Sequence, residues 1–202
     1  MREFVRSPQR LEGTIIVSGD KSISQRAAIL NTIAIGNAHL SNFCVGDDRN
    51  SVLRCLRKLG ARITRHTGCS TSGSDECFKV EGRGHGGLIE PTAILNAGNS
   101  GTTIRLITGL LAAHPFFSVI TGDASLRSRD MGRIVNPLSQ MGAKIWGRDQ
   151  NSLAPLAIRG GNLEGIEYDM VVSSAQVKSC VLLAGLHAQG RTYITQRAVS
   201  RD

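Results

Sequence analysis

Aromatic residues are scarce in this chain of 202 residues: Phe, Trp and Tyr together make up 4% of it. The basic residues are scattered, with no Lys/Arg block. Proteins that bind nucleic acid usually present a basic stripe interleaved with stacking aromatic rings, so these two absences weigh against that class. The net charge of +8 still indicates anionic partners, and small phosphorylated or carboxylated substrates explain it equally well.

The sequence also lacks a cysteine framework and a long apolar run. Its five cysteines are odd in number and never spaced C-x-x-C, which supports neither a set of disulfides nor a zinc site; they are Cys44, Cys55, Cys69, Cys77 and Cys180. Cys69 and Cys77 are placed to pair across a hairpin, but we expect reduced thiols. No signal-peptide-like segment opens the chain, and no uninterrupted apolar run approaches membrane length. We expect a soluble protein in a reducing, cytoplasmic setting.

What is present is an alternation of short strands and helices broken by glycines. In the first part we expect a strand at 11–17 and then a helix at 27–35, capped by Gly36-Asn37. A strand at 39–43 and a helix from Asp47-Asp48 to Gly60 should follow. This part should end in a hairpin whose strands begin at 61 and 77, around a polar tip at 67–76. In the second part we expect a strand at 92–95, a helix through Ala113 and a strand at 116–120. A helix within 122–141 should follow, which Pro137 kinks or delays, and then a hairpin whose second strand is 156–158. A strand at 168–172, a helix to about Ala188 and a strand from Tyr193 follow.

This order is an internal repeat. Leu56-Arg-Lys-Leu-Gly-Ala-Arg-Ile63 returns as Leu138-Ser-Gln-Met-Gly-Ala-Lys-Ile145, in the same place between a helix and a hairpin. Each copy therefore runs strand–helix–strand–helix–hairpin, a mixed α/β (α+β) class, with copies at about 15–85, 86–162 and 163–202. Residues 199–202 stand where the second helix of the third copy should begin, so we expect that copy to be incomplete.

One glycine-bracketed turn carries the clearest chemical signal. In Leu95-Asn-Ala-Gly-Asn-Ser-Gly-Thr-Thr-Ile-Arg-Leu106, glycines on either side of Asn99 and Ser100 let backbone N–H groups approach an anion at a helix start. Arg105 lies one turn further in, where it is placed to reach the same anion. Alone, the segment fits an ordinary helix cap equally well, and it is neither a P-loop nor a GxGxxG fingerprint.

Three helix starts of this kind occupy the same phase of the three copies, at 21–26, 99–105 and 173–178. Each combines hydroxyl-bearing residues with at least one Lys or Arg. Any single one is best interpreted as a capped helix. If the copies pack around a pseudo-threefold axis, however, the positive ends of three helix dipoles meet on one face, which predicts an anion-binding site.

The same residues resemble a known family. Gly19-Asp-Lys-Ser-Ile-Ser-Gln-Arg26, Leu95–Leu106 and Ser174-Ala-Gln-Val-Lys-Ser179 are similar, in order and spacing, to motifs of 5-enolpyruvylshikimate-3-phosphate synthases. The resemblance spans the whole chain but only about the first half of such an enzyme. It implies an inside-out α/β barrel lobe of βαβαββ repeats with pseudo-threefold symmetry and a truncated third repeat, formed by residues 15–202. Residues 1–14 would be a strand segment that belongs to or borders a second lobe.

The resemblance also implies a reaction. Such enzymes transfer the enolpyruvyl group of phosphoenolpyruvate to the 5-hydroxyl of shikimate 3-phosphate and release phosphate, through a tetrahedral intermediate, on the shikimate pathway to chorismate and the aromatic amino acids. No metal or organic cofactor is implied, and the full-length enzyme would be a monomer without nucleic-acid or membrane partners. The family's proton-shuttling acids lie in the second lobe. We therefore expect no turnover from this chain alone, and at best weak binding of shikimate 3-phosphate.

By the same resemblance, Lys21 is the catalytic residue and contacts both substrates. The residues implied to hold shikimate 3-phosphate are Lys21, Ser22, Arg26, Ser174, Gln176, Ser200 and Arg201. Those implied to line the phosphoenolpyruvate site are Lys21, Asn99, Gly101, Thr102, Arg129 and Gln176. The family usually has Arg-Pro where this chain has Arg129-Asp130, and a carboxylate beside the clamping arginine weakens it unless the carboxylate points away. Arg127 is the alternative clamp. Gln25 stands where the family often has His, at a position that is not a main contact.

Three other interpretations stay open. The sister enolpyruvyl transferase that acts on UDP-N-acetylglucosamine shares the fold and the donor, but it usually has Lys-Asn where this chain has Lys21-Ser22, and a cysteine-bearing loop that has no counterpart here. A non-catalytic basic domain would bind RNA or another polyanion with a steep salt dependence and would ignore shikimate 3-phosphate. A purely structural half would need its missing lobe in order to fold.

Overall fold

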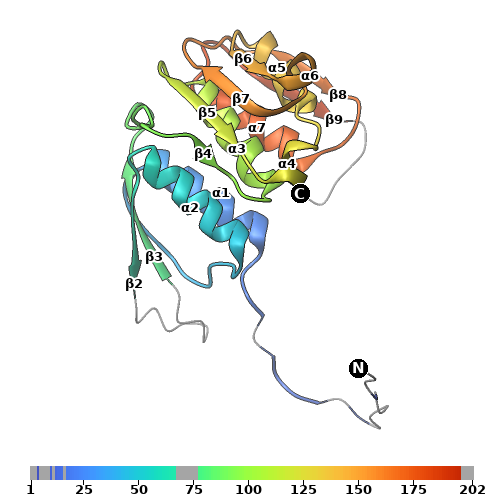
Figure 1. The fold of residues 1–202 in the computed structure, drawn as a ribbon. Helices are drawn as coiled ribbons and strands as arrows, with labels where there is room; N and C mark the ends of the chain where they lie inside the picture. Colours follow the sequence, from blue (N-terminus) through green and yellow to red (C-terminus); the bar gives the residue numbers. More distant parts are fainter. Residues whose placement is uncertain (1–3, 5–9, 11, 16, 67–76, 197–202) are drawn as a thin grey trace.

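The computed structural model describes residues 4, 10, 12–15, 17–66 and 77–196 (Figure 1). The first part of the described chain is an antiparallel sheet of three strands in the order β1-β3-β2. These strands are β1 (Ile35–Leu40), β2 (Arg62–His66) and β3 (Cys77–Arg83). Two helices pack on this sheet, α1 (Lys21–Ile33) and α2 (Asp47–Lys58).

The second part repeats this order with an extra strand. Its sheet has the order β4-β5-β7-β6, in which β4 pairs with β5 in parallel and the other pairs are antiparallel. The strands are β4 (Leu95–Asn96), β5 (Phe117–Thr121), β6 (Lys144–Gly147) and β7 (Leu153–Arg159). The helices are α3 (Gly101–Ala112), α4 (Ala124–Arg127), α5 (Gly132–Gln140) and α6 (Arg148–Asn151).

The last part is a parallel pair of strands joined through one helix. Strands β8 (Glu167–Met170) and β9 (Tyr193–Gln196) flank α7 (Ala175–Gly185). The pair has the same form as β4 and β5 around α3, and the arrangement β1-β3-β2 has the same form as β5-β7-β6. The predicted recurrence of element order is therefore present in the strand pairing, and the structure is of the mixed α/β class.

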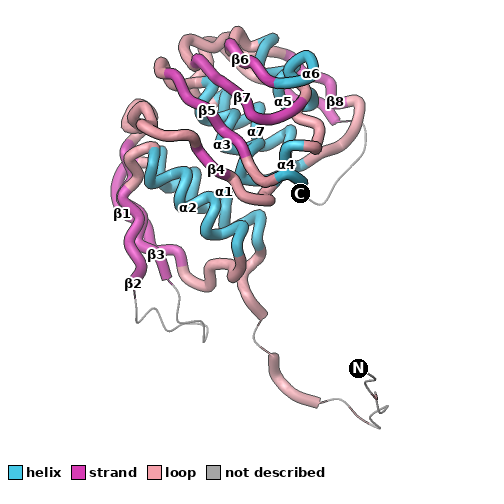
Figure 2. Tube along the Cα trace, viewed as in Figure 1, coloured by secondary structure: helices cyan, strands magenta, loops and turns pink. Residues whose placement is uncertain are grey.

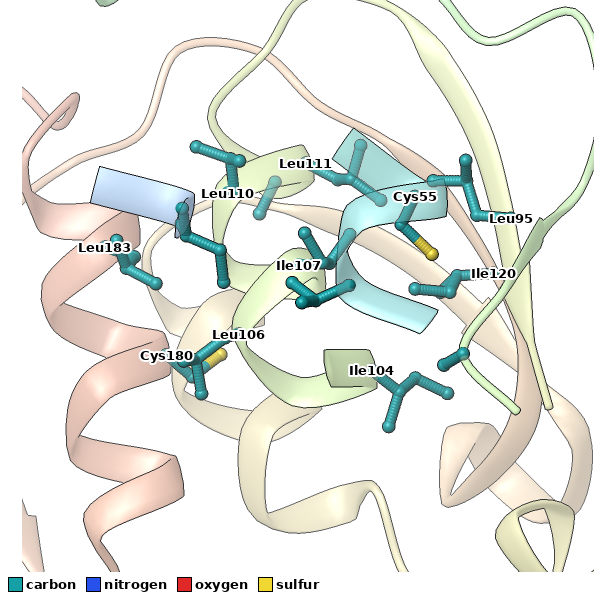
Figure 3. Close-up of a cluster of buried hydrophobic side chains, with 14 of the residues drawn as sticks. Cys55, Leu95, Ile104, Leu106, Ile107, Leu110, Leu111, Ile120, Cys180 and Leu183 are labelled. Atoms are coloured by element: carbon teal, nitrogen blue, oxygen red, sulfur yellow. The ribbon is translucent and has the colours of Figure 1, made fainter. Parts of the chain in front are cut away.

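Helix α3 lies at the centre of the core. Every residue of α3 except Arg105 is buried, and its apolar side chains meet those of α2, α7 and the second sheet (Figure 3). Helices α1, α2 and α3 contact one another between the first and second sheets (Figure 2). Helix α7 comes so close to α3 that a Cβ on Gly109 would lie 2.3 Å from the carbonyl oxygen of Cys180. No helix in the described part of the chain is both long enough and apolar enough to cross a bilayer.

Several predicted boundaries are wrong near the start of the chain. The predicted strand at 11–17 is not formed by residues 12–15 and 17, which pair with no described strand and leave Ile15 84% exposed. The helix predicted from residue 27 begins at Lys21, because the Asp20 carboxylate accepts the N–H of Ile23 at 2.7 Å and caps the helix six residues earlier.

The strand that follows is also displaced from its predicted place. Gly36 does not cap α1 but lies inside β1, which spans residues 35–40 instead of 39–43, because pairing with β3 from Ile35 onwards fixes its register. The predicted helix within 122–141 is two helices, α4 and α5, and the second starts late, at Gly132. The predicted helix to residue 188 ends at Gly185. The polar tip at 67–76 and residues 199–202 lie outside the described residues.

Candidate anion-binding site

The three helix starts predicted from the sequence are formed, and each is capped by a side-chain oxygen. Asp20 caps α1, Ser100 accepts the N–H of Thr103 at 3.2 Å to cap α3, and Ser174 accepts the N–H of Val177 at 3.4 Å to cap α7. None of the three first turns contains an acidic residue. At α1 the Asp20 carboxylate already faces the positive end of the helix dipole, whereas α3 and α7 are capped by hydroxyl groups, so the positive ends of these two dipoles are left to act on a bound anion.

Side-chain hydrogen bonds join these helix starts. Gln25 of α1 donates from Nε2 to Ser100 Oγ at 3.2 Å, and Gln176 of α7 donates from Nε2 to Thr102 Oγ1 of α3 at 3.1 Å. The first and third helices meet where Arg26 Nε donates to Ser179 Oγ at 3.0 Å. The N-terminal halves of α1, α3 and α7 therefore lie beside one another, as expected if the copies pack around a common axis. Gln25 is fully buried and holds two of the starts together, a role the sequence did not predict.

Between α3, α7 and the α4–α5 loop lies a polar hollow of about 390 Å³, called here the Arg105 cavity. Its lining residues are Arg105, Arg129, Asp130, Arg133, Ser174, Gln176 and Val177. The guanidinium of Arg105 donates to Gln176 Oε1 at 2.5 Å and to the carbonyl oxygen of Asp130 at 3.0 Å. Burial lowers the pKa of Arg105, and the positive charges of Arg129 and Arg133 lower it further. An anion placed among these three arginines would relieve their repulsion.

Between α1 and α7 lies a second polar hollow of about 470 Å³, called here the Arg26 cavity. Its lining residues are Asp20, Ser22, Ile23, Arg26, Ala175, Lys178 and Ser179. The cations come from both helices, since Lys178 of α7 lies with its Nζ 3.4 Å from Gln196 Oε1 and Arg26 belongs to α1. Two hydroxyl groups and two cations around one hollow provide donors for a phosphate group.

Arg129 is tied to the glycine-bracketed turn. It donates to Asn99 Oδ1 and, at 3.4 Å, to Ser125 Oγ, while Asn99 Nδ2 donates to Asp123 Oδ2 at 2.7 Å. The backbone N–H of Leu126 and the amide of Asn99 lower the pKa of Asp123, so this carboxylate stays ionised. This chain of contacts holds the Arg129 side chain at the edge of the Arg105 cavity.

The carboxylate of Asp130 does not contact Arg129. It accepts the N–H of Gly132 at 2.8 Å and lies 3.5 Å from Arg133 Nε. Arg127, the alternative clamp, donates to the carbonyl oxygen of Gly122 at 3.0 Å and lines neither cavity. Of the two arginines, only Arg129 is placed at a cavity.

Most of the predicted site residues in the described chain come together. Ser174, Gln176 and Arg129 line the Arg105 cavity, and Ser22 and Arg26 line the Arg26 cavity. Gly101 and Thr102 form the buried first turn of α3, and Asn99 and Lys21 are exposed beside the helix starts. Ser200 and Arg201 lie outside the described residues.

The site contains two donors that lie outside the predicted helix starts, Arg133 and Ser179. Ser179 comes directly after the predicted start at 173–178, whereas Lys178 is the cation of that start and follows the cap Ser174 by four residues, on the same face of α7. No such spacing points to Arg133, which depends on where the α4–α5 loop folds. Among the described residues, no cluster of His, Cys, Asp or Glu is arranged to hold a metal ion.

A family model described as EPSP synthase (3-phosphoshikimate 1-carboxyvinyltransferase) matches residues 5–202. The chain is 53% identical over 194 residues to a 3-phosphoshikimate 1-carboxyvinyltransferase of Gloeothece citriformis, covering 95% of this chain and 42% of that protein. It is 49% identical over 202 residues to one of Herpetosiphon aurantiacus, covering 100% of this chain and 45% of that protein. The structure is similar to that of an EPSP synthase from Acinetobacter baumannii, with a TM-score of 0.86 and 42% identity over 94% of this chain and 41% of the other. The chain thus spans less than half the length of the relatives it matches.

Proposed function

The chain belongs to the EPSP synthase family, and from that premise we propose that it forms the first lobe of an enzyme that transfers the enolpyruvyl group of phosphoenolpyruvate to shikimate 3-phosphate. In this reaction the 5-hydroxyl loses its proton as its oxygen adds to C2 of phosphoenolpyruvate, and a proton adds to C3. The tetrahedral intermediate then loses a proton from C3 as the bond from C2 to the phosphate oxygen breaks, which releases phosphate and gives the enol ether. The sister transferase that acts on UDP-N-acetylglucosamine is disfavoured, because the matched relatives carry the shikimate enzyme's name.

The observation that carries this proposal is the meeting of three capped helix starts around two cation-lined cavities. Both substrates are polyanions, and the two cavities offer separate sets of donors. We assign the Arg26 cavity, with Ser22 and Arg26, to the phosphate of shikimate 3-phosphate. We assign the Arg105 cavity, with Arg129 at its edge, to phosphoenolpyruvate. Ser174 and Gln176 lie where the two substrates would meet, and Lys21 at the start of α1 would reach both. Fixed donors of this kind are usually the largest contribution to catalysis.

The same proposal extends to the architecture of the lobe. We propose an inside-out α/β barrel with pseudo-threefold symmetry, whose repeats lie at about 15–85, 86–162 and 163–202. In support, α2 packs across α1 and α3, and α5 packs across α3 and α7. The remaining pair, α7 and α1, is flanked by a hollow lined mainly by Ile29, Leu30, Leu182, Leu183 and Leu186. A second helix in the third repeat would occupy that hollow.

We further propose that turnover requires a second lobe, that the complete enzyme is a cytoplasmic monomer and that the reaction uses no cofactor. The chain by itself is then a half-site. It should bind shikimate 3-phosphate weakly, because only part of the ligand is surrounded, and it should show no turnover.

The test is a titration of the purified chain with shikimate 3-phosphate, followed by NMR shifts of Lys21, Arg26 and Gln176. We expect saturable shifts confined to these residues and their neighbours. Inorganic phosphate at the same concentration is the control for the contribution of charge alone. Shifts that are as large with inorganic phosphate, or that spread over the surface and vanish with moderate salt, would instead identify a general polyanion-binding domain.

A further inference from the structure

The side-chain amide of Gln176 is held at both ends. Its oxygen accepts from Arg105 Nη1 at 2.5 Å, and its nitrogen donates to Thr102 Oγ1 at 3.1 Å. A glutamine amide has two N–H donors, so one N–H of Nε2 remains for a ligand in the cavity that Gln176 lines. The donor is useful for catalysis only if the amide does not rotate.

Arg105 decides which way this amide faces. A guanidinium carries only N–H donors, so Arg105 can donate to the oxygen of the amide but cannot form a hydrogen bond with its NH₂ group. Thr102 cannot make that choice, because a hydroxyl both donates and accepts. Rotating the amide by half a turn would set the NH₂ group against the guanidinium and leave both groups without their bonds. The orientation of Gln176 therefore depends on Arg105.

Arg105 is itself fixed by other contacts. Its Nη2 donates to the carbonyl oxygen of Asp130 at 3.0 Å, and its Nη1 lies 3.5 Å from the carbonyl oxygen of Gly101. A Cβ on residue 101 would lie 2.8 Å from Nη1, so a glycine there leaves the space that the guanidinium occupies. The guanidinium of Arg105 thus links the first turn of α3, the α4–α5 loop and the first turn of α7. Arg105 is also the one residue of α3 that is only partly buried.

We propose that Arg105 is a positioning residue, which acts on the bound substrates through Gln176 by fixing the amide so that one N–H of Nε2 faces the ligand. Arg129, at the edge of the same cavity, is the arginine that meets the ligand directly. This inference rests on the proposed function for the identity of the ligand, but the fixed amide is testable without any ligand.

The first test is the NMR signal of the Gln176 side-chain NH₂ group in the purified chain, assigned by its loss in Gln176→Ala. We expect two proton signals displaced from the positions of a solvent-exposed glutamine, with a cross-relaxation contact to Thr102. In Arg105→Met both signals should move to the positions of a freely rotating glutamine, and the contact to Thr102 should disappear. Arg133→Met is the matched control, since it removes a cation from the same cavity without touching Gln176, and it should leave both signals in place. Unchanged signals in Arg105→Met would overturn the proposal.

Arg105→Lys guards against a loss of folding in the methionine variant. It keeps the charge and the long stem, but it lacks the planar fork that binds Gln176 and Asp130 together. The Gln176 signals should shift in the same direction as in Arg105→Met. If they stay at their wild-type positions, charge alone is sufficient and the fork does not position the amide.

The second test is a double-mutant cycle on the affinity for shikimate 3-phosphate. Arg105→Met and Gln176→Ala should each weaken binding by about tenfold, the value of one lost hydrogen bond, and the double variant should be no weaker than Gln176→Ala alone. Arg133→Met should instead combine additively with Gln176→Ala. Additive losses for Arg105 and Gln176 would mean that Arg105 binds the ligand itself, which contradicts the proposal. If the wild-type chain does not bind shikimate 3-phosphate, the proposed half-site fails, and the NH₂ signals still decide the role of Arg105.

Discussion

Two hollows of different character lie side by side along helices α1 and α7. The Arg26 cavity, of about 470 Å³, is lined by hydroxyl groups and cations, whereas the neighbouring apolar groove, of about 360 Å³, is lined by five Ile and Leu side chains. The hydrogen bond between Arg26 and Ser179 marks the border, because both residues line both hollows. The same two helices thus form a polar hollow at their first turns and an apolar one further along.

The difference follows from position along a helix. In the first turn the backbone N–H groups have no partner within the helix, so this end attracts anions and suits hydroxyl-bearing and basic residues. Beyond that turn the backbone is internally bonded, and only side chains remain to meet a partner. Leu182 of α7 and Leu186, which caps its end, are 47% and 51% exposed there. These apolar side chains suit contact with protein and not with a phosphorylated ligand. Cavity volume does not distinguish the two hollows, whereas position on the helix does.

The largest effect we expect comes from moving α7, which borders both hollows. In Gly109→Ala the new Cβ would lie 2.3 Å from the carbonyl oxygen of Cys180, so α3 and α7 must separate. We expect the free energy of unfolding to fall by about 3 kcal/mol, as for other overpacked cores, measured by urea denaturation. Gly161→Ala is the matched control, because no atom lies within 4 Å of its added Cβ. Equal stability of the two variants would show that the α3–α7 contact is looser than the structure has it.

A second pair of variants compares a buried and an exposed leucine of α7, both of which border the apolar groove. Leu183 is 6% exposed and belongs to the core, while its neighbour Leu182 is 47% exposed. Leu183→Ala should lower the free energy of unfolding by about 2 to 3 kcal/mol through the cavity it leaves, and Leu182→Ala by less than about 1 kcal/mol. Urea denaturation at the same protein concentration measures both. A similar loss in both variants would mean that the groove is covered in solution, for example by a second copy of the chain.

The sequence predicted the elements well where a repeat and a turn residue agreed. Gly60 ends α2 with a φ of +88°, and a Gly-Ala pair leads into β2 and β6 in both copies. The sequence-based prediction was wrong where strand pairing decides the bounds of an element. Strand β1 starts at Ile35 because β3 pairs with it there, and no local propensity indicates that start.

The site shows the same division between local and long-range information. The hydroxyl-rich helix starts were visible in the sequence because a cap is a local feature. The bonds between Gln25 and Ser100 and between Arg105 and Gln176 join residues far apart in the chain, and nothing in the local pattern at either end specifies them. Arg133 likewise reaches the Arg105 cavity only because α4 and α5 are separate helices.

A third prediction concerns ligand binding on the polar side of the border. Arg26→Ala removes a cation and a fork from the Arg26 cavity, so the affinity for shikimate 3-phosphate should fall by about 10- to 100-fold, in line with the loss of a charged hydrogen bond. Isothermal titration or NMR shifts at fixed ionic strength would measure it. Arg159→Ala, on β7 and outside both polar cavities, lowers the net charge by the same amount and should change the affinity less than about twofold, because screening weakens distant charges. Equal losses of affinity in both variants would mean that the ligand is bound by the general positive charge of the surface and not by a defined site.

The smallest effect lies just past the other end of α7, where the helix carries no anion-binding groups. His187 follows α7, and its ring lies 4.5 Å from that of His85 and 5.1 Å from that of His114, measured between centroids. Burial lowers the pKa of His187, and the neighbouring His114 and His85 lower it further, against the opposing effect of the carbonyl oxygens of Leu183 and His85.

Because this pKa is lower in the folded state than in the unfolded chain, the unfolded chain binds the proton first as the pH falls. Stability should therefore be full above the unfolded pKa of about 6.5 and decline as the pH drops below it, until the folded state is also protonated. His187→Asn keeps a polar group at this position without the titrating ring, so its melting temperature should decrease less than that of the wild type between about pH 7 and pH 5. The difference should be small, since His187 is only half-buried.

Parallel curves of melting temperature against pH for the two proteins would mean that the acid sensitivity arises elsewhere. A steeper decline in the variant would mean that the charged ring stabilises the fold through its two carbonyl partners.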